Sequence, residues 1–438
     1  MSMWVAHASV PWAEPLAVAA RFSGHNMALL YSGVHEPFSG GLSYLFVHPL
    51  ETISGDEWAE LPLLPETSDG LPLWVGYLGY GMREDGTKSA ASPVTLPDFS
   101  LTRYAELYRF NHTQKTIEHF VARDAANAGL PATTVEWQDI TGTRREAPHA
   151  RPLTITNLAS NFTRAAYESV IAKTIEQIHA GNFYQANITR KFYGQFAQEP
   201  DSWQLFEALC AASPAPYSAY IRSGRKAILS SSPECFLSID AHGVMTTRPI
   251  KGSARRSDDI TADMAIRETL KTSDKNHAEN LMIVDLMRND LARVSLAQSV
   301  EVVEQSALYS YRTIHHLIST IRAQKLEHIG AYEAVRACFP AGSMTGAPKI
   351  AAMRWCQASE QVERGLYSGA IGWFGGGNTC DLSVVIRTLI LNGNDFEFQV
   401  GGGIVADSTP EDEWRETITK ARGILAALGL SEDDLARL

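Results

Sequence analysis

Residues 396–425 read FEFQVGGGIVADSTPEDEWRETITKARGIL, and in this run a strand pattern passes directly into a helix pattern. The segment FEFQVGGGIV alternates apolar with other residues before its glycines, which predicts a β-strand. Ser408 or Thr409 can then cap a helix near 410 to 428. Strands and helices follow one another in this way along much of the chain, so the sequence indicates a mixed α/β fold.

The part of the chain before about residue 122 is rich in strand patterns. Residues 124–160 lose this periodicity, and we expect a linker or irregular crossover there. We therefore divide the chain into an N-terminal β-rich region, 1–145, and a second region, 155–433. The N-terminal runs, which suit antiparallel strands between Gly, Pro and Ser turns, are MALLYS, SYLFVHP, LWVGYLGYG, RYAELYRF and TIEHFVAR.

The second region alternates strands and helices without a fixed repeat, which disfavours solenoids and propellers. Thr163 can cap a helix over 164–180 that stops at Gly181. Further helices are expected at DDITADMAIRETLKTS, KNHAENLMIVDLMRNDLA and near 347–358. The expected strands are FYQANITRKF, YSAYIRS, KAILSSS, ECFLSI, GVMTTRPI, SYRTIHHLISTI, YSGAIGWF and LSVVIRTLIL.

Composition excludes several classes of protein. The chain has 438 residues, 45% of them hydrophobic, which is enough for a sizeable core. Its 38 basic and 49 acidic residues give a net charge of −11, which argues against binding nucleic acid or an anionic membrane. Neither a signal peptide nor a membrane-spanning run is apparent, so we expect a cytoplasmic protein. The five cysteines are scattered and suit small buried side chains.

Three glutamates are candidate metal ligands. Glu413 and Glu416 lie at i and i+3 on one predicted helix, and Glu279 lies on another helix whose apolar neighbours imply burial. Carboxylates without a histidine or cysteine pattern suit a hard ion such as Mg²⁺. Glutamates on the surface of a helix are the alternative.

Lys251 lies in RPIKGSARR, residues 248–256, between a proline-led strand end and a turn of small residues. It is a solvated loop charge, a phosphate ligand or a nucleophile, and the local sequence leaves all three open. Glu234, in SSSPECF, can project into a cleft as a general acid, and a plain glutamate at a strand start fits equally well.

Other candidates concern anions. Adjacent strand residues His315 and His316 should face opposite sides, so they cannot bind one metal together. Arg387 would be costly to bury unless a substrate carboxylate or an internal salt bridge pairs it. The segments FPAGSMTGAPKIAAM, with free amides near Gly346 and Ala347, and VGGGIVADS can each bind an anion or be simple turns. Neither segment fits a nucleotide-binding fingerprint.

The order of these segments resembles the chorismate-utilising enzymes, which include anthranilate synthase component I, aminodeoxychorismate synthase component I, isochorismate synthase and salicylate synthase. The resemblance is dense over 160–425 and looser through ALLYSG, HPLETI and LWVGYLGYG. It implies an α/β (α+β) fold with a large antiparallel β-sandwich flanked by helices, in which both regions pack as one intertwined unit. The segments that carry it are GNFYQANITR, SSSPECF, TRPIKGSARR, AENLMIVDLMRNDLARV, HHL, FPAGSMTGAPK, IRTL, GGGIVADS and EWRET.

The resemblance also implies roles for individual residues. It implies Mg²⁺ held through Glu279 and Glu416 with Glu413 close by, and Glu234 as the acid on the departing C4 hydroxyl of chorismate. Relatives carry a second acid where this chain has Asn276. His316 would lie beside the ring. The residues expected to bind substrate are Thr345, Trp373, Arg387, Gly401, Gly402, Gly403 and Lys420.

Two positions separate the members of the family. In relatives that add water to chorismate, the position of Gln185 is occupied by a lysine that activates the water. Glutamine has no basic nitrogen and cannot do this, so ammonia is the expected nucleophile. Lys251 in PIKG matches aminodeoxychorismate synthases, whereas anthranilate synthases read PIAG. We therefore expect Lys251 to add to C2 of chorismate before ammonia displaces it, giving 4-amino-4-deoxychorismate for the synthesis of para-aminobenzoate and folate. Asn187 also resembles this subgroup.

The resemblance further predicts partners. The motifs leave no room for a glutaminase domain, so we expect ammonia from a partner glutaminase subunit or from solution. ALLYSG resembles the tryptophan-binding stretch of anthranilate synthases, with a possible pocket around Ser32, but Tyr31 replaces the usual acid of inhibited enzymes. The rival readings are anthranilate synthase component I and a catalytically silent chorismate-binding subunit.

Overall fold

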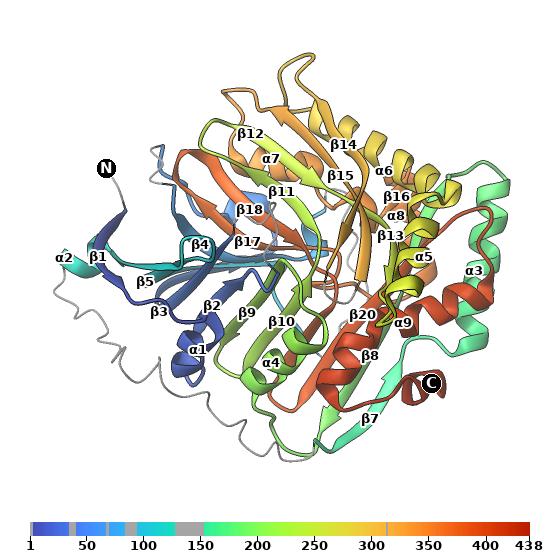
Figure 1. Cartoon of the computed structure of the whole chain (residues 1–438), viewed down its shortest axis with the longest axis horizontal. Coiled ribbons are helices and arrows are strands. Elements are labelled where there is room, and N and C mark those ends of the chain that lie inside the picture. Colours follow the sequence, from blue (N-terminus) through green and yellow to red (C-terminus); the bar gives the residue numbers. More distant parts are fainter. Residues whose placement is uncertain (1–2, 35–40, 67–69, 84–93, 128–152, 312–313) are drawn as a thin grey trace.

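The computed structural model describes residues 3–34, 41–66, 70–83, 94–127, 153–311 and 314–438 (Figure 1). Its helices are α1 (Pro15–Ala19), α2 (Arg123–Asn127), α3 (Arg164–His179), α4 (Ser202–Ala212), α5 (Ile260–Lys271), α6 (Asp274–Ala292), α7 (Ala331–Cys338), α8 (Lys349–Glu360), α9 (Pro410–Leu428) and α10 (Glu432–Ala436). No helix in these ranges is apolar over the length needed to cross a membrane.

The strands pair antiparallel throughout the described ladders. They are β1 (Trp4–Val10), β2 (Met27–Tyr31), β3 (Leu42–Gly55), β4 (Pro72–Leu78), β5 (Phe99–Asn111), β6 (Thr116–Ala122), β7 (Ile155–Ser160), β8 (Gln185–Phe196), β9 (Tyr217–Ser223), β10 (Lys226–Ser232), β11 (Cys235–Ile239), β12 (Val244–Arg248), β13 (Ile250–Arg255), β14 (Glu301–Ser310), β15 (Ile314–Gln324), β16 (Gly346–Ala347), β17 (Ala370–Gly375), β18 (Thr379–Val384), β19 (Thr388–Asn392) and β20 (Asp395–Ile404).

Strand β5 joins two branches of the sheet because it is long enough to pair with β3, β4 and β6. One branch runs from β3 through β2, β9, β10, β19 and β20 to β8. The other runs from β4 through β17, β18, β11 and β12 to β15. Strands before residue 122 therefore hydrogen-bond with strands after residue 155 in both branches, β2 with β9 and β4 with β17, as Figure 1 shows by colour.

Helices cover each branch and enclose the hydrophobic core. Helices α3 and α8 pack on β8, α4 packs on β10 and α9 packs on β20, whereas α6 packs on β13 and β15. One large cluster of buried side chains lies under the first group of helices, and a second lies under α6 and α7. The five cysteines are buried and free, as predicted. The predicted fold, antiparallel strands flanked by helices, is thus confirmed.

Several predicted elements are confirmed at their boundaries. Helix α3 covers the predicted range, and Thr163 caps it by accepting a hydrogen bond from the amide of Ala166. Helix α9 is capped by Thr409, whose hydroxyl oxygen accepts from the amide of Asp412. Of the predicted linker, residues 128–152 lie outside the described residues, and its ends form α2 and β7.

Other details of the prediction were wrong. The run LSVVIRTLIL forms two strands, β18 and β19, because Arg387 adopts a left-handed φ of 50° that breaks the strand between them. Gly346 and Ala347 form β16, paired with β8, so the following helix begins only at Lys349. Lys251, expected between a strand end and a turn of small residues, lies inside β13, and those small residues continue the strand.

Candidate active site

A cavity of about 1240 Å³ lies between the branches, with α9 and α6 among the elements that line it. Most of the predicted site residues line this cavity, although they come from distant parts of the sequence. They are Glu234, Lys251, Glu279, His316, Arg387, Gly401, Gly403, Glu413, Glu416 and Lys420.

Lys251 reaches the cavity from a β-bulge. The register of β13 against β15 shifts between Ile250 and Ser253, and Gly252 takes a φ of +90°. An extra residue of this kind turns a strand and redirects its side chains. Burial lowers the pKa of Lys251, and nearby Lys420 lowers it further, against the attraction of Glu279. The arrangement therefore favours a neutral, nucleophilic amine.

Glu234 occupies the turn between β10 and β11, where it is only 5% exposed. Burial raises the pKa of its carboxyl to about 7, although a hydrogen bond from Ser343 and the charge of Lys251 oppose the shift. The Oγ atom of Ser343 donates to Oε1 of Glu234 at 2.6 Å. A carboxyl with such a pKa can hold a proton near neutral pH and deliver it to a leaving group.

Arg387 and His316 face the same cavity. Within the described residues, the Arg387 guanidinium has no hydrogen bond or ion pair, and its left-handed backbone fits the sharp turn after β18. The Oγ atom of Ser253 lies 2.6 Å from Nδ1 of His316. Burial, and then the charge of Arg387, lower the pKa of His316 well below its usual value, so this imidazole is neutral. His315 points instead to Asp263 at 3.1 Å, which confirms that the two histidines face opposite sides.

Helix α9 and strand β20 form the acidic side of the cavity. Glu413 is 6% exposed, and Ser408 donates to its Oε1, while its Oε2 has no partner among the described residues. Burial, reinforced by Glu416, raises the pKa of Glu413 to about 7. Lys420 lies 2.6 Å from Glu416 and lowers the pKa of that carboxyl. A methyl group at Gly402 would lie 2.6 Å from Oε2 of Glu413, so glycine lets this carboxylate approach the strand.

The edge of β20 fits anion binding. Pairing of β20 with β19 stops at Phe398, so from Gln399 onward β20 pairs along one edge only, with β8. Gly401 and Gly403 line the cavity, and Lys420 donates from Nζ to the carbonyl oxygen of Gly401 at 2.7 Å. Backbone amides along such an edge are available to a carboxylate.

Glu279 is less buried than its apolar neighbours suggested. Its side chain is 18% exposed and lies 4.0 Å from Nζ of Lys275. Leu281, one of the apolar neighbours that implied burial, is itself 54% exposed. Across the described ranges, no three carboxylate, histidine or cysteine side chains are already grouped as a metal site. The three glutamates nevertheless line one cavity, and the unpartnered Oε2 of Glu413 is a hard oxygen donor of the kind that suits Mg²⁺.

Gln185 lies just behind the lining of the cavity. It is fully buried, and neither atom of its amide has a partner among the described residues. A methyl group at Gly403 would lie 2.8 Å from Nε2 of Gln185 and 3.1 Å from Nζ of Lys251. The amide of Gln185 and the amine of Lys251 therefore flank the same glycine.

Thr345 and Trp373 lie elsewhere than the resemblance implied. Thr345 is fully buried, and its hydroxyl donates to the carbonyl oxygen of Gly342 at 3.2 Å, within its own turn. Trp373 points away from the cavity because it shares a face of β17 with Ile371. Trp373 instead lines a second, smaller pocket of about 360 Å³.

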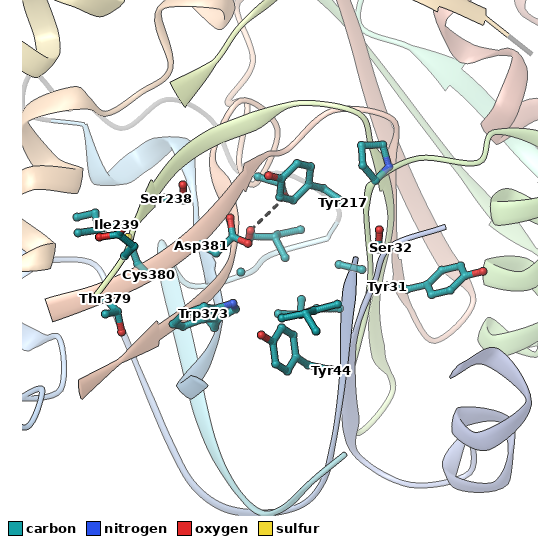
Figure 2. A pocket seen from close by; sticks show the side chains of 18 of the residues that line it. Tyr31, Ser32, Tyr44, Tyr217, Ser238, Ile239, Trp373, Thr379, Cys380 and Asp381 are labelled. Atoms are coloured by element: carbon teal, nitrogen blue, oxygen red, sulfur yellow. Dashed lines mark hydrogen bonds between the residues drawn. The ribbon is translucent and has the colours of Figure 1, made fainter. Parts of the chain in front are cut away.

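The second pocket also contains Ser32, the residue expected in a tryptophan site. Figure 2 shows Ser32, Tyr44, Trp373 and Asp381 around it. The rings of Tyr44 and Trp373 meet edge to face at 6.3 Å. Burial raises the pKa of Asp381 to about 6, although Arg248 opposes the shift. Aromatic walls and a carboxyl group suit a small cationic or amphoteric ligand.

Comparison with known proteins decides the family. A sequence profile described as "chorismate binding enzyme" matches residues 38–426. The chain belongs to the chorismate-binding enzyme family. The predicted family resemblance is thereby confirmed.

Relatives of this chorismate-binding enzyme have two kinds of name. Aminodeoxychorismate synthase component 1 of Salmonella typhimurium is 36% identical over 87% of this chain and 82% of its own length. Aminodeoxychorismate synthase of Streptomyces griseus is 38% identical over 81% of this chain, which spans only 50% of that protein. Anthranilate synthase component 1 of Pseudomonas putida is 32% identical over 97% of this chain and 87% of its own length.

Solved structures of similar proteins share the fold. Anthranilate synthase component I of Streptococcus pneumoniae superposes with a TM-score of 0.74 at 26% identity, covering 89% of this chain and 93% of that one. The menaquinone-specific isochorismate synthase MenF of Escherichia coli gives 0.76 at 18% identity, covering 98% and 96%. The second likeness concerns the fold alone.

Sequence reasoning missed one ion pair behind the cavity of this chorismate-binding enzyme. Arg364 and Glu360 are both fully buried and lie 2.6 Å apart. Arg364 also donates to the carbonyl oxygens of Asn187 and Met344, each at 2.7 Å, and so ties β8 to the turn before β16. Glu360 and Arg364 are four residues apart, a spacing that predicts an ion pair on a helix. Helix α8 ends at Glu360, however, so Arg364 lies beyond the helix and the rule does not apply to this pair.

Proposed function

We propose that this chorismate-binding enzyme is the aminating component of aminodeoxychorismate synthesis, which converts chorismate and ammonia into 4-amino-4-deoxychorismate for para-aminobenzoate and folate. The observation that carries the proposal is Lys251, a lysine with a lowered pKa that lines the cavity together with Glu234. The names of the S. typhimurium and S. griseus relatives support the same assignment.

The proposed reaction has two displacements. Glu234 protonates the C4 hydroxyl of chorismate, which leaves as water while the neutral amine of Lys251 forms a bond to C2. Ammonia then forms a bond to C4, and the C2–nitrogen bond to Lys251 breaks as the double bond returns. The pyruvyl ether is kept, and one hydroxyl has been exchanged for one amine.

Substrate carboxylates would be bound from two sides. The unpaired guanidinium of Arg387 can form two parallel hydrogen bonds to a carboxylate, and the free edge of β20 at Gly401 and Gly403 supplies backbone donors. Neutral His316 would lie beside the ring without adding charge. Gln185, which lacks a basic nitrogen, would disfavour activation of water next to Lys251.

Mg²⁺ is proposed as the cofactor, with Glu279 and Glu416 as ligands and Glu413 nearby. When bound, the ion would neutralise a ring carboxylate of chorismate and strengthen its binding. Lys420 and Lys275 now neutralise two of these glutamates, so the lysines and the ion would compete for them. Glu279→Gln should raise the Mg²⁺ concentration needed for half-maximal binding by tenfold or more, measured by calorimetry with the metal alone. Unchanged Mg²⁺ affinity would contradict the assignment.

A glutaminase subunit is the proposed source of ammonia. The relatives named "component 1" imply a second component, and the chemistry needs free ammonia at C4. The test is to compare glutamine with an ammonium salt as nitrogen donor in the presence and absence of such a subunit.

Anthranilate synthase component I is the alternative, favoured by the P. putida relative, which covers almost the whole chain. That reaction releases pyruvate and forms an aromatic product. Lys251 argues against it, because anthranilate formation needs ammonia to bond to C2 directly and leaves no step for a lysine nucleophile at that carbon. A silent chorismate-binding subunit is disfavoured by the same lysine and by Glu234.

The second pocket is proposed to be the site around Ser32 that the resemblance implied, with tryptophan as its ligand. Asp381 and the aromatic walls formed by Tyr44 and Trp373 support an amino acid there. Tyr31 replaces the acid of inhibited relatives, so we expect binding without strong inhibition. Calorimetry and an activity assay with tryptophan test both statements.

Replacement of Lys251 tests the proposed function. Lys251→Ala should lower kcat by at least about a hundredfold, since covalent catalysis is lost, while chorismate binding remains. Lys251→Arg should be equally inactive because guanidinium stays protonated. Lys226→Ala is the control, at a partly exposed lysine outside the lining of the cavity whose Nζ atom donates to the carbonyl oxygen of Thr95. Unchanged turnover in Lys251→Ala would refute the covalent role.

A further inference from the structure

Ser343 makes a direct contact with the proposed catalytic acid. Its Oγ atom donates to Oε1 of Glu234 at 2.6 Å, and both side chains are 5% exposed. The two residues are 109 positions apart and line the same cavity. A short hydrogen bond to a carboxylate, buried in this way, is among the stronger polar contacts in proteins.

The turn that carries Ser343 is held firmly. It is a short 3₁₀ helix, Gly342–Met344, in which the amide of Thr345 donates to the carbonyl of Gly342. A methyl group at Gly342 would lie 2.6 Å from Cδ2 of Leu286, so the turn packs closely on α6. Arg364 then holds the carbonyl of Met344 at 2.7 Å. The hydroxyl of Ser343 therefore has a defined position.

Glu234 is also fixed by its backbone. Its carbonyl oxygen accepts from the amide of Val384, and its own amide donates to the hydroxyl of Ser232. Ser343 donates to Oε1, and the backbone of Ile250 also hydrogen-bonds to the carboxyl. These hydrogen bonds hold the carboxyl group in a defined orientation in the lining of the cavity.

Charged groups face Glu234 from several elements. Lys251 on β13, Lys420 on α9, Arg387 before β19, and the phenol of Tyr367 all influence it. Burial raises its pKa most, and Ser343 is the largest influence in the opposite direction, ahead of both lysines. The hydroxyl favours the carboxylate because it donates a hydrogen bond to it.

We propose that Ser343 is a positioning residue, which orients the carboxyl of Glu234 and stabilises the carboxylate that forms when the C4 hydroxyl departs. This role rests on the proposed function. In that step the C4–oxygen bond breaks, the proton moves from Glu234 to the departing oxygen, and water leaves. Ser343 keeps its own proton and donates throughout.

Carbon-13 NMR of the glutamate carboxyl carbons tests the contact directly. Glu234 is assigned by the signal lost in Glu234→Gln, and its titration is followed in the full chain and in Ser343→Ala. We expect the midpoint to rise by about one pH unit in Ser343→Ala, since one donor to the charged form is lost. Ser343→Thr, which keeps the hydroxyl, should restore it.

Kinetics supply the second readout. Ser343→Ala should lower kcat about tenfold with little change in KM for chorismate, and should move the alkaline limb of the kcat profile upward with the midpoint. Ser319→Ala is the matched control, because Ser319 is also buried and its hydroxyl donates to Oδ1 of Asn280 at 2.6 Å, away from Glu234. It should shift neither midpoint nor profile.

The outcomes separate the two proposals. An unchanged Glu234 midpoint in Ser343→Ala overturns the role of Ser343, whatever reaction the enzyme performs. A raised midpoint in a protein that forms no aminated product would support the contact and overturn the proposed function. A midpoint that rises equally in Ser319→Ala would mean that general loosening of the core, and not this hydrogen bond, sets the titration.

Discussion

Lys251 and Glu234 owe their expected chemistry to neighbours that are remote in the sequence. Burial dominates the pKa shifts of both, lowering that of the amine and raising that of the carboxyl. One residue is thereby biased toward a neutral nucleophile and the other toward a neutral acid. Such opposite shifts in adjacent groups are typical of acid–base pairs in active sites.

The rate should depend on pH through these two groups. Glu234 acts when protonated, so at constant free ammonia kcat should fall above about pH 7, approaching tenfold per pH unit. Lys251 acts when neutral, so the rate should also fall at low pH. The measurement is kcat against pH for the unmodified chain and for Glu234→Gln, which should lack the alkaline limb. A rate that rises steadily through pH 9 in both proteins would contradict the role of Glu234.

The orientation or role of a single residue was predictable from the sequence only where it did not depend on residues from other elements. Opposite orientations of His315 and His316 follow from strand geometry alone. The role of Lys251 did not follow from RPIKGSARR, because the burial that lowers its pKa, and the charges of Glu279 and Lys420 that modify it, come from the packing of other elements. Trp373 was misplaced because the choice between the two faces of β17 depends on what each face packs against.

Helix α9 and strand β20 position the acidic groups as a unit. Glu413, Glu416 and Lys420 share one face of α9 because they are spaced by three and four residues. That face lies close to Gly402, where a side chain would collide with Glu413. The N-terminus of α9 thus decides where two proposed metal ligands lie.

Removal of the N-cap of α9 should affect both stability and metal binding. Thr409→Ala should lower the free energy of unfolding by about 1 kcal/mol and weaken Mg²⁺ binding, because the first turn holds Glu413. Thr163→Ala removes the corresponding cap of α3, which carries none of the proposed site residues. It should cost similar stability and leave Mg²⁺ affinity unchanged. Equal Mg²⁺ affinities in the two variants would contradict the expectation.

Elements were easier to predict than their ends. The long helices α3, α6 and α9 show regular apolar spacing and caps, so their type and position were predictable. The break between β18 and β19 was not predictable, since VVIRTLI is apolar except for Arg387 and Thr388, and nothing local signals a left-handed residue.

The whole molecule depends on pairing between distant regions. Gly76 on β4 lies opposite Gly372 on β17, where an N-terminal strand meets a C-terminal one. A methyl group at Gly76 would lie 1.9 Å from the carbonyl oxygen of Ser100 on the neighbouring β5. Side chains are therefore excluded from this junction, and the sequence alone did not specify the pairing.

Disturbing this junction should destabilise the active site at a distance. Gly76→Ala should lower the free energy of unfolding by about 1–3 kcal/mol or more and lower activity at elevated temperature in parallel. Gly24→Ala is the control, since no atom lies within 4 Å of the position that its methyl group would take. Thermal unfolding and residual activity, measured on the same samples, give the comparison. Full activity persisting in Gly76→Ala above its unfolding midpoint would show that the regions behave independently.

The most direct test of the central claim is the identity of the product from chorismate, Mg²⁺ and an ammonium salt, determined by mass spectrometry together with an assay for free pyruvate. We predict an aminated product that keeps its pyruvyl ether, with no pyruvate released. Anthranilate accompanied by an equal amount of pyruvate would contradict the account and assign the chain to the alternative reaction.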